Sequence, residues 1–196
     1  LINGLIPHFY DGELTGSVKV ADMDVSKEEI YAISKRVGSV FQNPRSQFFC
    51  PDTSSELAFG CENLGMPVEQ INERIEHVVR EVELENLVDR DIFKLSGGEK
   101  QRIACGSVAA MLPDIIVLDE PTSNLDIESI EILKHILMLW KKHNKTIIIA
   151  EHRLYWLKDV CDRAVYLSDG KIQMNIPMQE LEDYPEQKLK QLGLRT

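Results

Sequence analysis

Residues 115–120 read IIVLDE, four apolar residues followed directly by two carboxylates. This short apolar run predicts a buried strand that delivers Asp119 and Glu120 to its C-terminal end. Successive strand residues point to opposite faces, so the two carboxylates could take two different tasks if the strand continues that far. One could hold a divalent cation, while the other orients or deprotonates a water molecule. The alternative is a strand that ends in a solvated acidic turn.

Strands and helices alternate on both sides of this stretch. We predict further strands at 17–22, 37–41, 146–150 and 164–167, the last ending at Asp169-Gly170. We predict helices at 26–36 (with Ser26 as N-cap), 98–111, 127–143 and 154–161. In the helix at 127–143, one face carries Leu133, Ile136, Leu137 and Trp140. The alternation predicts an α/β fold with a mostly parallel sheet, whose ligands bind at the C-terminal ends of the strands.

The segment from about 44 to 95 has a different pattern, because nothing in it resembles a core strand. Its clearest element is a helix with apolar residues at spacings of three and four: Val68, Ile71, Ile75, Val78, Val79 and Val82. We interpret the segment as a helical lobe inserted into the α/β core. The tail at 177–196 has the pattern of a short helix and a linker.

Composition narrows the class of protein. The chain has 196 residues, 43% of them hydrophobic, which is enough for a folded core. Its net charge of −10 makes it a poor general binder of nucleic-acid backbones. The four cysteines form no C-x-x-C pair, so zinc and thioredoxin-like sites lack support. No apolar run approaches the ~18 residues of a bilayer span, and no signal peptide is evident.

A second stretch, residues 95–102, reads LSGGEKQR. Ser96 and Glu99 fit a capping box, which predicts a helix that begins here. Gly97 and Gly98 indicate more than a cap, because glycine is costly at a helix start and useful where backbone must approach a ligand closely. Free N–H groups and the positive end of a helix dipole suit phosphate. The simpler alternative is an ordinary well-capped helix.

Two further polar residues follow predicted strands. His152 comes after TIIIA (146–150) and could contact a γ-phosphate or the attacking water, although a lone histidine is more often a surface residue. Gln42 follows the strand at 37–41, and a glutamine before a turn is by itself ordinary.

These motifs occur in one order, each at the end of a predicted element, and together they resemble the nucleotide-binding domain of ATP-binding-cassette (ABC) ATPases. LSGGEKQR is similar to the signature motif, IIVLDE to Walker B and SNLD (123–126) to the D-loop. His152 is similar to the switch histidine and Gln42 to the Q-loop glutamine. The resemblance runs from residue 1 to about 175. It implies a P-loop NTPase fold with a RecA-like core and the inserted helical lobe.

The resemblance also implies roles. It makes Glu120 and His152 catalytic, and it assigns binding of ATP to Gln42, Ser96, Gly97, Gly98, Asp119 and Asp126. Gln42 and Asp119 are the expected contacts of Mg²⁺. The implied partners are a second nucleotide-binding domain, arranged head to tail, and a transmembrane subunit that docks on the Q-loop and helical lobe. The implied location is the cytoplasmic face of the cell membrane, with no nucleic-acid partner.

A finer resemblance lies in the lobe. FQNPRSQFF (41–49) and ELAFGCENLGMP (56–67) are similar to the ATPases of energy-coupling-factor (ECF) importers, which take up vitamins and transition-metal cations. NGLIPHFYDGELTG (3–16) is similar to ECF ATPases with two fused nucleotide-binding domains. We therefore expect an importer subunit. Two alternatives are a soluble ABC-type ATPase head of DNA repair or translation and a non-hydrolysing dimerisation module.

The sequence contains no P-loop, G-x-x-x-x-G-K-S/T, because Gly170-Lys171 has neither the upstream glycine nor a following Ser or Thr. We expect a fragment of a longer ATPase; the alternative is a natural protein that has lost nucleotide binding. The expected parts are an incomplete core at 1–43 without the P-loop strand, the helical subdomain at 44–96, the signature helix and remaining core at 97–176, and a helix or linker at 177–196. This chain alone should bind ATP weakly or not at all. We also expect a gap beside the strand at 115–118 and a marginally stable, association-prone fragment, unless the sheet closes around that gap.

Overall fold

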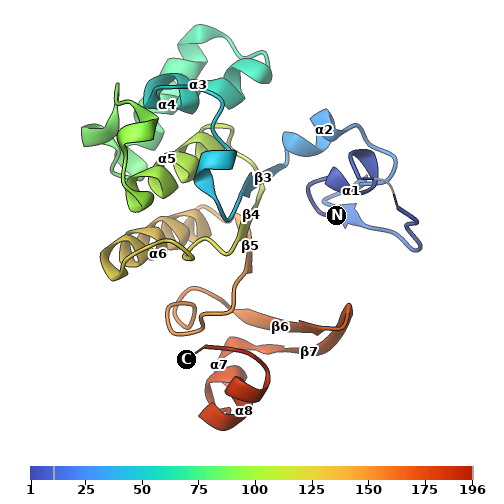
Figure 1. Ribbon diagram of the computed structural model, residues 1–196. Coiled ribbons are helices and arrows are strands. Elements are labelled where there is room, and N and C mark those ends of the chain that lie inside the picture. The colour runs from blue at the N-terminus through green and yellow to red at the C-terminus, as the bar shows by residue number, and fades with distance from the viewer. Residues whose placement is uncertain (11, 196) are drawn as a thin grey trace. The chain divides into compact units, whose positions relative to one another are not determined.

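The computed structural model describes residues 1–10 and 12–195, and they form two compact units, Leu1–Ala150 and Glu151–Thr196. Figure 1 shows the elements of each unit. None of the helices in the described ranges is both long and apolar enough to cross a bilayer.

A parallel three-stranded sheet organises the first unit. It consists of β3 (Val37–Val40), β4 (Ile115–Asp119) and β5 (Thr146–Ala150) in the order β3-β4-β5. Val40 pairs with Leu118, and Leu118 pairs with Ile149, so the three strands end at one edge. The predicted α/β fold with a parallel sheet is confirmed. β4 has a hydrogen-bonded neighbour on each side, so the expected gap beside this strand is wrong.

The chain between β3 and β4 is helical. It forms η1 (Pro44–Ser46), α3 (Thr53–Asn63), α4 (Val68–Glu81), η2 (Glu85–Leu87), η3 (Ile92–Lys94) and α5 (Gly97–Ala110). α3 and α4 both pack against α5. A Cβ added at Gly106 of α5 would lie 2.8 Å from Leu84 Cδ1 and 2.9 Å from Leu57 Cδ2, so the glycine permits this close approach. On α4 the predicted apolar face is buried at Ile71 and Val78, whereas Val68 is exposed.

α6 (Ile127–Lys142) connects β4 to β5 and carries the predicted apolar face. Its buried residues are Ile130, Leu133, Ile136, Leu137 and Trp140. The four predicted positions therefore all face the core.

The N-terminal segment differs from its prediction. Instead of one strand at 17–22, β1 (Lys19–Val20) and β2 (Met23–Asp24) form a short antiparallel pair. Besides the short α1 (Leu5–His8), the segment contains α2 (Ile30–Ser34), which is shorter than the predicted helix at 26–36. Ser26 does not cap α2, because its backbone N–H and its hydroxyl both donate to the Asp24 carboxylate in a local turn. Val20, Val25, Ile33 and Val37 form a small core here.

The second unit is an antiparallel pair with two short helices. β6 (Arg163–Ser168) pairs with β7 (Lys171–Pro177), and α7 (Met178–Glu182) and α8 (Glu186–Gln191) follow. The predicted helix at 154–161 is wrong, since this stretch forms only turns. The predicted strand at 164–167 exists, but it belongs to this pair and not to the parallel sheet. The missed signal is Asp169-Gly170, a two-residue loop with positive φ at both residues, typical of a hairpin.

Candidate active site

Asp119 and Glu120 lie at the centre of the edge where the parallel strands end. Asp119 is the last residue of β4, pairs with Ala150 and is exposed. Glu120 has already left the strand, with a φ of 39° in the left-handed region. Its backbone N–H donates to the Ala150 carbonyl at 2.8 Å. The strand thus persists through Asp119 only, and the turn at Glu120, not simple alternation, sets where the second carboxylate lies.

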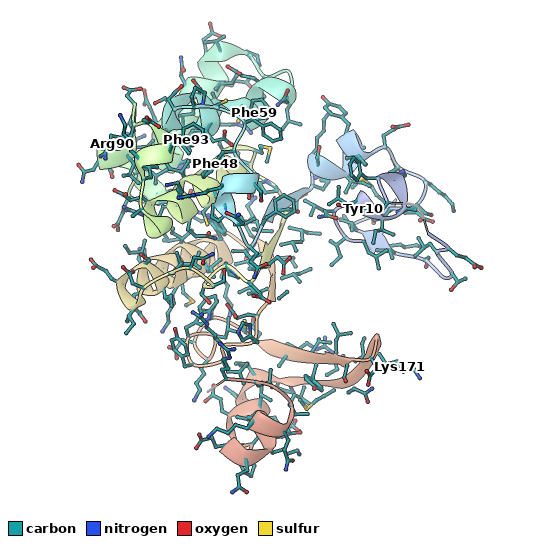
Figure 2. The ribbon with its side chains drawn as sticks, in the orientation of Figure 1. Tyr10, Phe48, Phe59, Arg90, Phe93 and Lys171 are labelled. Atoms are coloured by element: carbon teal, nitrogen blue, oxygen red, sulfur yellow. The ribbon has the colours of Figure 1, made fainter. Side chains whose placement is uncertain are left out.

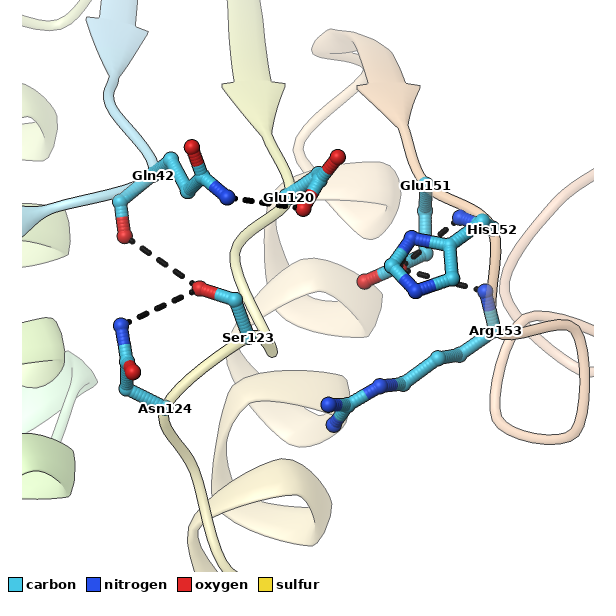
Figure 3. Close-up of polar contacts among 7 residues, drawn as sticks. All are labelled: Gln42, Glu120, Ser123, Asn124, Glu151, His152 and Arg153. Carbon is cyan, nitrogen blue, oxygen red and sulfur yellow. Dashed lines mark hydrogen bonds and ion pairs between the residues drawn. The ribbon is translucent and has the colours of Figure 1, made fainter. Parts of the chain in front are cut away.

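Gln42 reaches this turn from the neighbouring strand. Its Nε2 donates to Glu120 Oε2 at 2.8 Å, although the two residues are 78 positions apart (Figure 3). The Ser123 hydroxyl donates to the Gln42 carbonyl at 3.5 Å, and Asn124 Nδ2 donates to Ser123 Oγ at 3.2 Å. An ionised carboxylate is a pure acceptor, so an amide N–H is a suitable partner for Glu120. The residues after β3 and β4 therefore form one connected polar network.

The start of α5 is the capping box that the sequence predicts. Ser96 is the N-cap: its Oγ accepts from the Glu99 N–H at 3.3 Å, and the Ser96 N–H donates to Glu99 Oε2 at 2.7 Å. The hydrogen bond from the Ser96 N–H, followed by that with its side chain, holds the pKa of Glu99 below its ordinary value. Phosphate binding by Ser96, Gly97 and Gly98 stays a prediction.

Close packing inside the molecule also explains why glycine occurs at both Gly97 and Gly98. A Cβ at Gly97 would lie 3.0 Å from the Asn124 carbonyl oxygen, and one at Gly98 would lie 2.1 Å from Ser129 Oγ of α6. The two glycines therefore let the start of α5 approach the loop after β4 and the start of α6. The sequence alone does not reveal this neighbour, since Ser129 is 31 positions away in the chain.

A double substitution tests this close packing of α5 on α6. Gly98→Ala should lower the free energy of unfolding by about 1–3 kcal/mol, as overpacking commonly does. Adding Ser129→Gly removes the side chain that would clash with the alanine. After correction for the effect of Ser129→Gly alone, the double variant should regain most of the lost free energy of unfolding. Urea unfolding of the single and double variants measures the coupling. Additive losses would show that Gly98 does not need the space beside Ser129.

Asp126 caps the next helix. It is the N-cap of α6, and its Oδ1 accepts from the Ser129 N–H at 2.8 Å. Hydrogen bonds from Ser129, the side chain first and then the backbone, hold the pKa of Asp126 below its ordinary value of 3.8. A contact of Asp126 with nucleotide stays a prediction beside this structural role.

His152 belongs to the second unit. Its Nδ1 lies 3.4 Å from Glu151 Oε1, and the same oxygen accepts from the N–H groups of His152 and Arg153 at 2.9 and 3.2 Å (Figure 3). The His152 carbonyl accepts from the Arg195 N–H at 2.8 Å. These bonds fix the backbone around the imidazole. Its approach to the carboxylates of the first unit stays a prediction.

The oxygen ligands at the strand ends fit a hard cation that also binds water and substrate phosphates. The carboxylate of Asp119 makes no hydrogen bond or ion pair within the described residues, so this exposed group is available. In the same ranges no three His, Cys, Asp or Glu side chains gather as a metal site. Mg²⁺ is commonly bound by one or two carboxylates together with water and substrate phosphates. A single available carboxylate is thus compatible with Mg²⁺ but not with a dedicated protein cage.

Comparison with known proteins identifies the family to which the chain belongs. The model of the ABC transporter family matches residues 2–123. A putative ABC transporter ATP-binding protein of Treponema denticola is 49% identical over 195 residues, which are 100% of this chain and 40% of that protein. A similarly named protein of Pyrococcus abyssi is 40% identical, covering 99% of this chain and 69% of its own length. The chain belongs to the ABC transporter family.

A solved structure agrees with the fold. CbiO1 of Clostridium perfringens, described as part of the ABC transporter complex CbiONQ, superposes with a TM-score of 0.82 at 26% identity. The match covers 97% of this chain and 74% of that one. The chain nevertheless spans only about 40% of the Treponema denticola relative.

Proposed function

We propose that this chain is part of the ATP-hydrolysing subunit of an ECF-type importer, which couples hydrolysis to uptake of a vitamin or a metal cation. The observation that carries the proposal is the Gln42–Glu120 hydrogen bond at the carboxyl edge of the parallel sheet. Ligands of open α/β sheets bind at this edge. The likeness to CbiO1, a component of a transporter complex, supports the ECF class.

In this proposal the chain's own residues position water and substrate. Glu120, turned out of the strand, accepts a proton from the attacking water, and Gln42 holds its carboxylate in place. Asp119 would hold Mg²⁺ with Gln42 nearby, and bound Mg²⁺ would neutralise charge on the phosphates of ATP. Ser96, Gly97 and Gly98 would contact the γ-phosphate of ATP held by a second nucleotide-binding domain. His152 would steady the γ-phosphate of the ATP on which Asp119 and Glu120 act, and Asp126 would support the D-loop. Phosphoryl transfer needs such positioning more than covalent help.

The same proposal includes a transmembrane partner at the cytoplasmic face of the membrane. A groove of about 250 Å³ lies between the end of β3, α3 and α5. Phe49 lines it, is 75% exposed and stacks on Phe59 at 4.9 Å between ring centroids. Figure 2 shows Phe59 on the helical segment of the first unit. The buried Glu56 fixes this loop, since it accepts from the N–H groups of Phe49 and Cys50, both at 2.9 Å. An exposed aromatic anchor in a groove suits a protein partner.

Docking is tested by Phe49→Ser in the complete protein that contains this chain. We expect the membrane subunit to be lost from the purified complex, because aromatic anchors commonly contribute more than ~2 kcal/mol to an interface. The matched control is Phe9→Ser, which changes a phenylalanine that is 70% exposed outside the groove. Retention of the membrane subunit by the Phe49 variant would contradict the docking site. DNA-stimulated hydrolysis without any membrane partner would contradict the importer.

A further inference from the structure

A second groove lies between the end of α4 and the first half of α6, two helices of the first unit (Figure 1). It has a volume of about 270 Å³, slightly below the usual range of small-molecule sites, so it is of the size to receive one or two side chains of a partner. Its apolar lining consists of Val82, Ile132 and Ile136. Ile132 is the most accessible of the three, because it is half-buried while the other two are buried.

The rest of the lining is strongly acidic. It consists of Glu81, Glu83, Glu128, Glu131 and His135, with no lysine or arginine among the described residues that line the groove. The carboxylates of Glu83, Glu128 and Glu131 make no hydrogen bond or ion pair in the described part of the chain. The helix dipole favours an acidic residue in the first turn of α6, which explains Glu128 but neither of the other two. The groove therefore carries negative charge that nothing in the fold requires.

The basic groups beside the groove contact its wall and not these three unpaired carboxylates. Glu81, whose side chain is 10% exposed, has an imidazole on each side: His143 Nδ1 lies 3.2 Å from its Oε1 and His77 Nδ1 lies 3.5 Å from its Oε2. Arg102 of α5 donates to the backbone carbonyl of Glu83 at 2.9 Å. This hydrogen bond and the left-handed φ of 55° at Glu83 fix the rim of the groove. A partner would thus meet a surface that is already formed.

The distribution of charge indicates what kind of partner fits. A groove of this sign repels nucleic-acid backbones and anionic lipid surfaces. Within the described ranges no three carboxylate or imidazole groups gather as a metal site, so the acidic side chains are spread along the groove and do not converge on one ion. Spread carboxylates around an apolar side chain are instead complementary to a chain segment that carries several cations around an apolar residue.

We propose that this groove docks a short basic amphipathic segment of a partner protein. One apolar side chain of the segment lies against Ile132, and its lysine or arginine side chains face Glu83, Glu128 and Glu131. The proposal goes beyond ATP hydrolysis and does not depend on it, because none of the candidate active-site residues described above lines the groove. The groove is also distinct from the one that contains Phe49, since the two share no lining residue.

The test uses the complete protein that contains this chain and a fluorescein-labelled helical peptide composed of leucine and lysine in equal number. Binding is followed by fluorescence anisotropy at low ionic strength, and we expect it to saturate. Glu131→Lys should weaken binding at least ~10-fold, because it replaces an attraction at the groove by a repulsion. Glu73→Lys, which makes the same change of charge on the exposed surface of α4 outside the groove, is the matched control and should bind normally.

The apolar part of the proposal has its own variants. Ile132→Ser should weaken binding of the same peptide, and a peptide with serine in place of leucine should bind the unmodified protein less tightly. Because Ile132 is half-buried, the unfolding curve of Ile132→Ser is measured in parallel. If that variant is impaired in folding, the serine peptide decides the point. Phe49→Ser alters the other groove and should leave binding unchanged.

The outcomes separate this proposal from the ATPase proposal. Peptide binding that Glu131→Lys weakens and Glu73→Lys does not supports the groove, even if the protein hydrolyses no ATP. Equal weakening by both variants would overturn it, because net charge and not the groove would then explain binding. Absence of saturable binding, equally tight binding of the serine peptide, or loss of binding in Phe49→Ser alone would overturn it as well.

Discussion

Glu120→Gln in the complete protein should slow ATP hydrolysis by at least ~10²-fold, the usual effect of losing a general base. The amide cannot accept the proton from water. It keeps the size of the side chain and an acceptor oxygen, so Gln42 Nε2 can still donate to residue 120 as it does now at 2.8 Å. ATP affinity should therefore survive. Single-turnover hydrolysis and nucleotide titration measure the two effects separately.

The matched control for this variant is Glu73→Gln, which removes the same charge from the exposed surface of α4. We expect its turnover to equal that of the unmodified protein. If Glu120→Gln also turned over normally, Glu120 would lose its catalytic role. If it lost ATP binding together with turnover, the carboxylate would act on the bound state and not on the reacting water.

Leu118→Ala should lower the free energy of unfolding by about 2–5 kcal/mol, the range for such truncations in protein cores. Leu118 is fully buried in the central strand and pairs with Val40 on one side and Ile149 on the other. Its loss leaves a cavity in the central strand, two residues before Glu120. The urea midpoint should fall while the slope of the transition stays constant.

Ile127→Ala provides the comparison, because Ile127 is 77% exposed at the start of α6. Its effect should stay within ~0.5 kcal/mol, as for ordinary surface substitutions. Equal losses in the two variants would mean that Leu118 is not part of a close-packed core. A change of slope for Leu118→Ala would mean that the two units no longer unfold as they do in the unmodified protein.

The sequence predicted the strands of the parallel sheet and the long helices of the first unit well, because their patterns are local. IIVLDE and TIIIA are short apolar runs, and the face of α6 repeats at helical spacing. The prediction failed where contacts between residues far apart in the chain determine the local structure. The residues of 154–161 favour a helix by apolar spacing, yet they form turns in a small unit with Trp156 and Leu157 buried. The gap expected beside β4 rests on the missing P-loop strand of the family, whereas in the structure β5 pairs directly with β4.

The candidate site shows the same division. Ser96 and Glu99 are three residues apart, so their capping box could be predicted from spacing alone. The Gln42–Glu120 hydrogen bond joins residues 78 positions apart. From the sequence, only the order of the motifs indicated that these two residues belong to one site. The packing of Gly98 on Ser129 has no sequence signature, because it arises where the start of α5 meets the first turn of α6, 31 positions away in the chain.

The left-handed backbone at Glu120 has an evolutionary consequence. Glycine adopts this conformation freely, and asparagine and aspartate tolerate it, whereas a longer side chain is held there at a cost in folding free energy. Selection for a stable fold alone would thus drive position 120 away from glutamate. Selection for hydrolysis would drive it back, because only a carboxylate that reaches the strand edge can act as the base. Under the proposed catalytic role, position 120 is therefore subject to two opposed selective pressures, one for an unstrained backbone and one for hydrolysis.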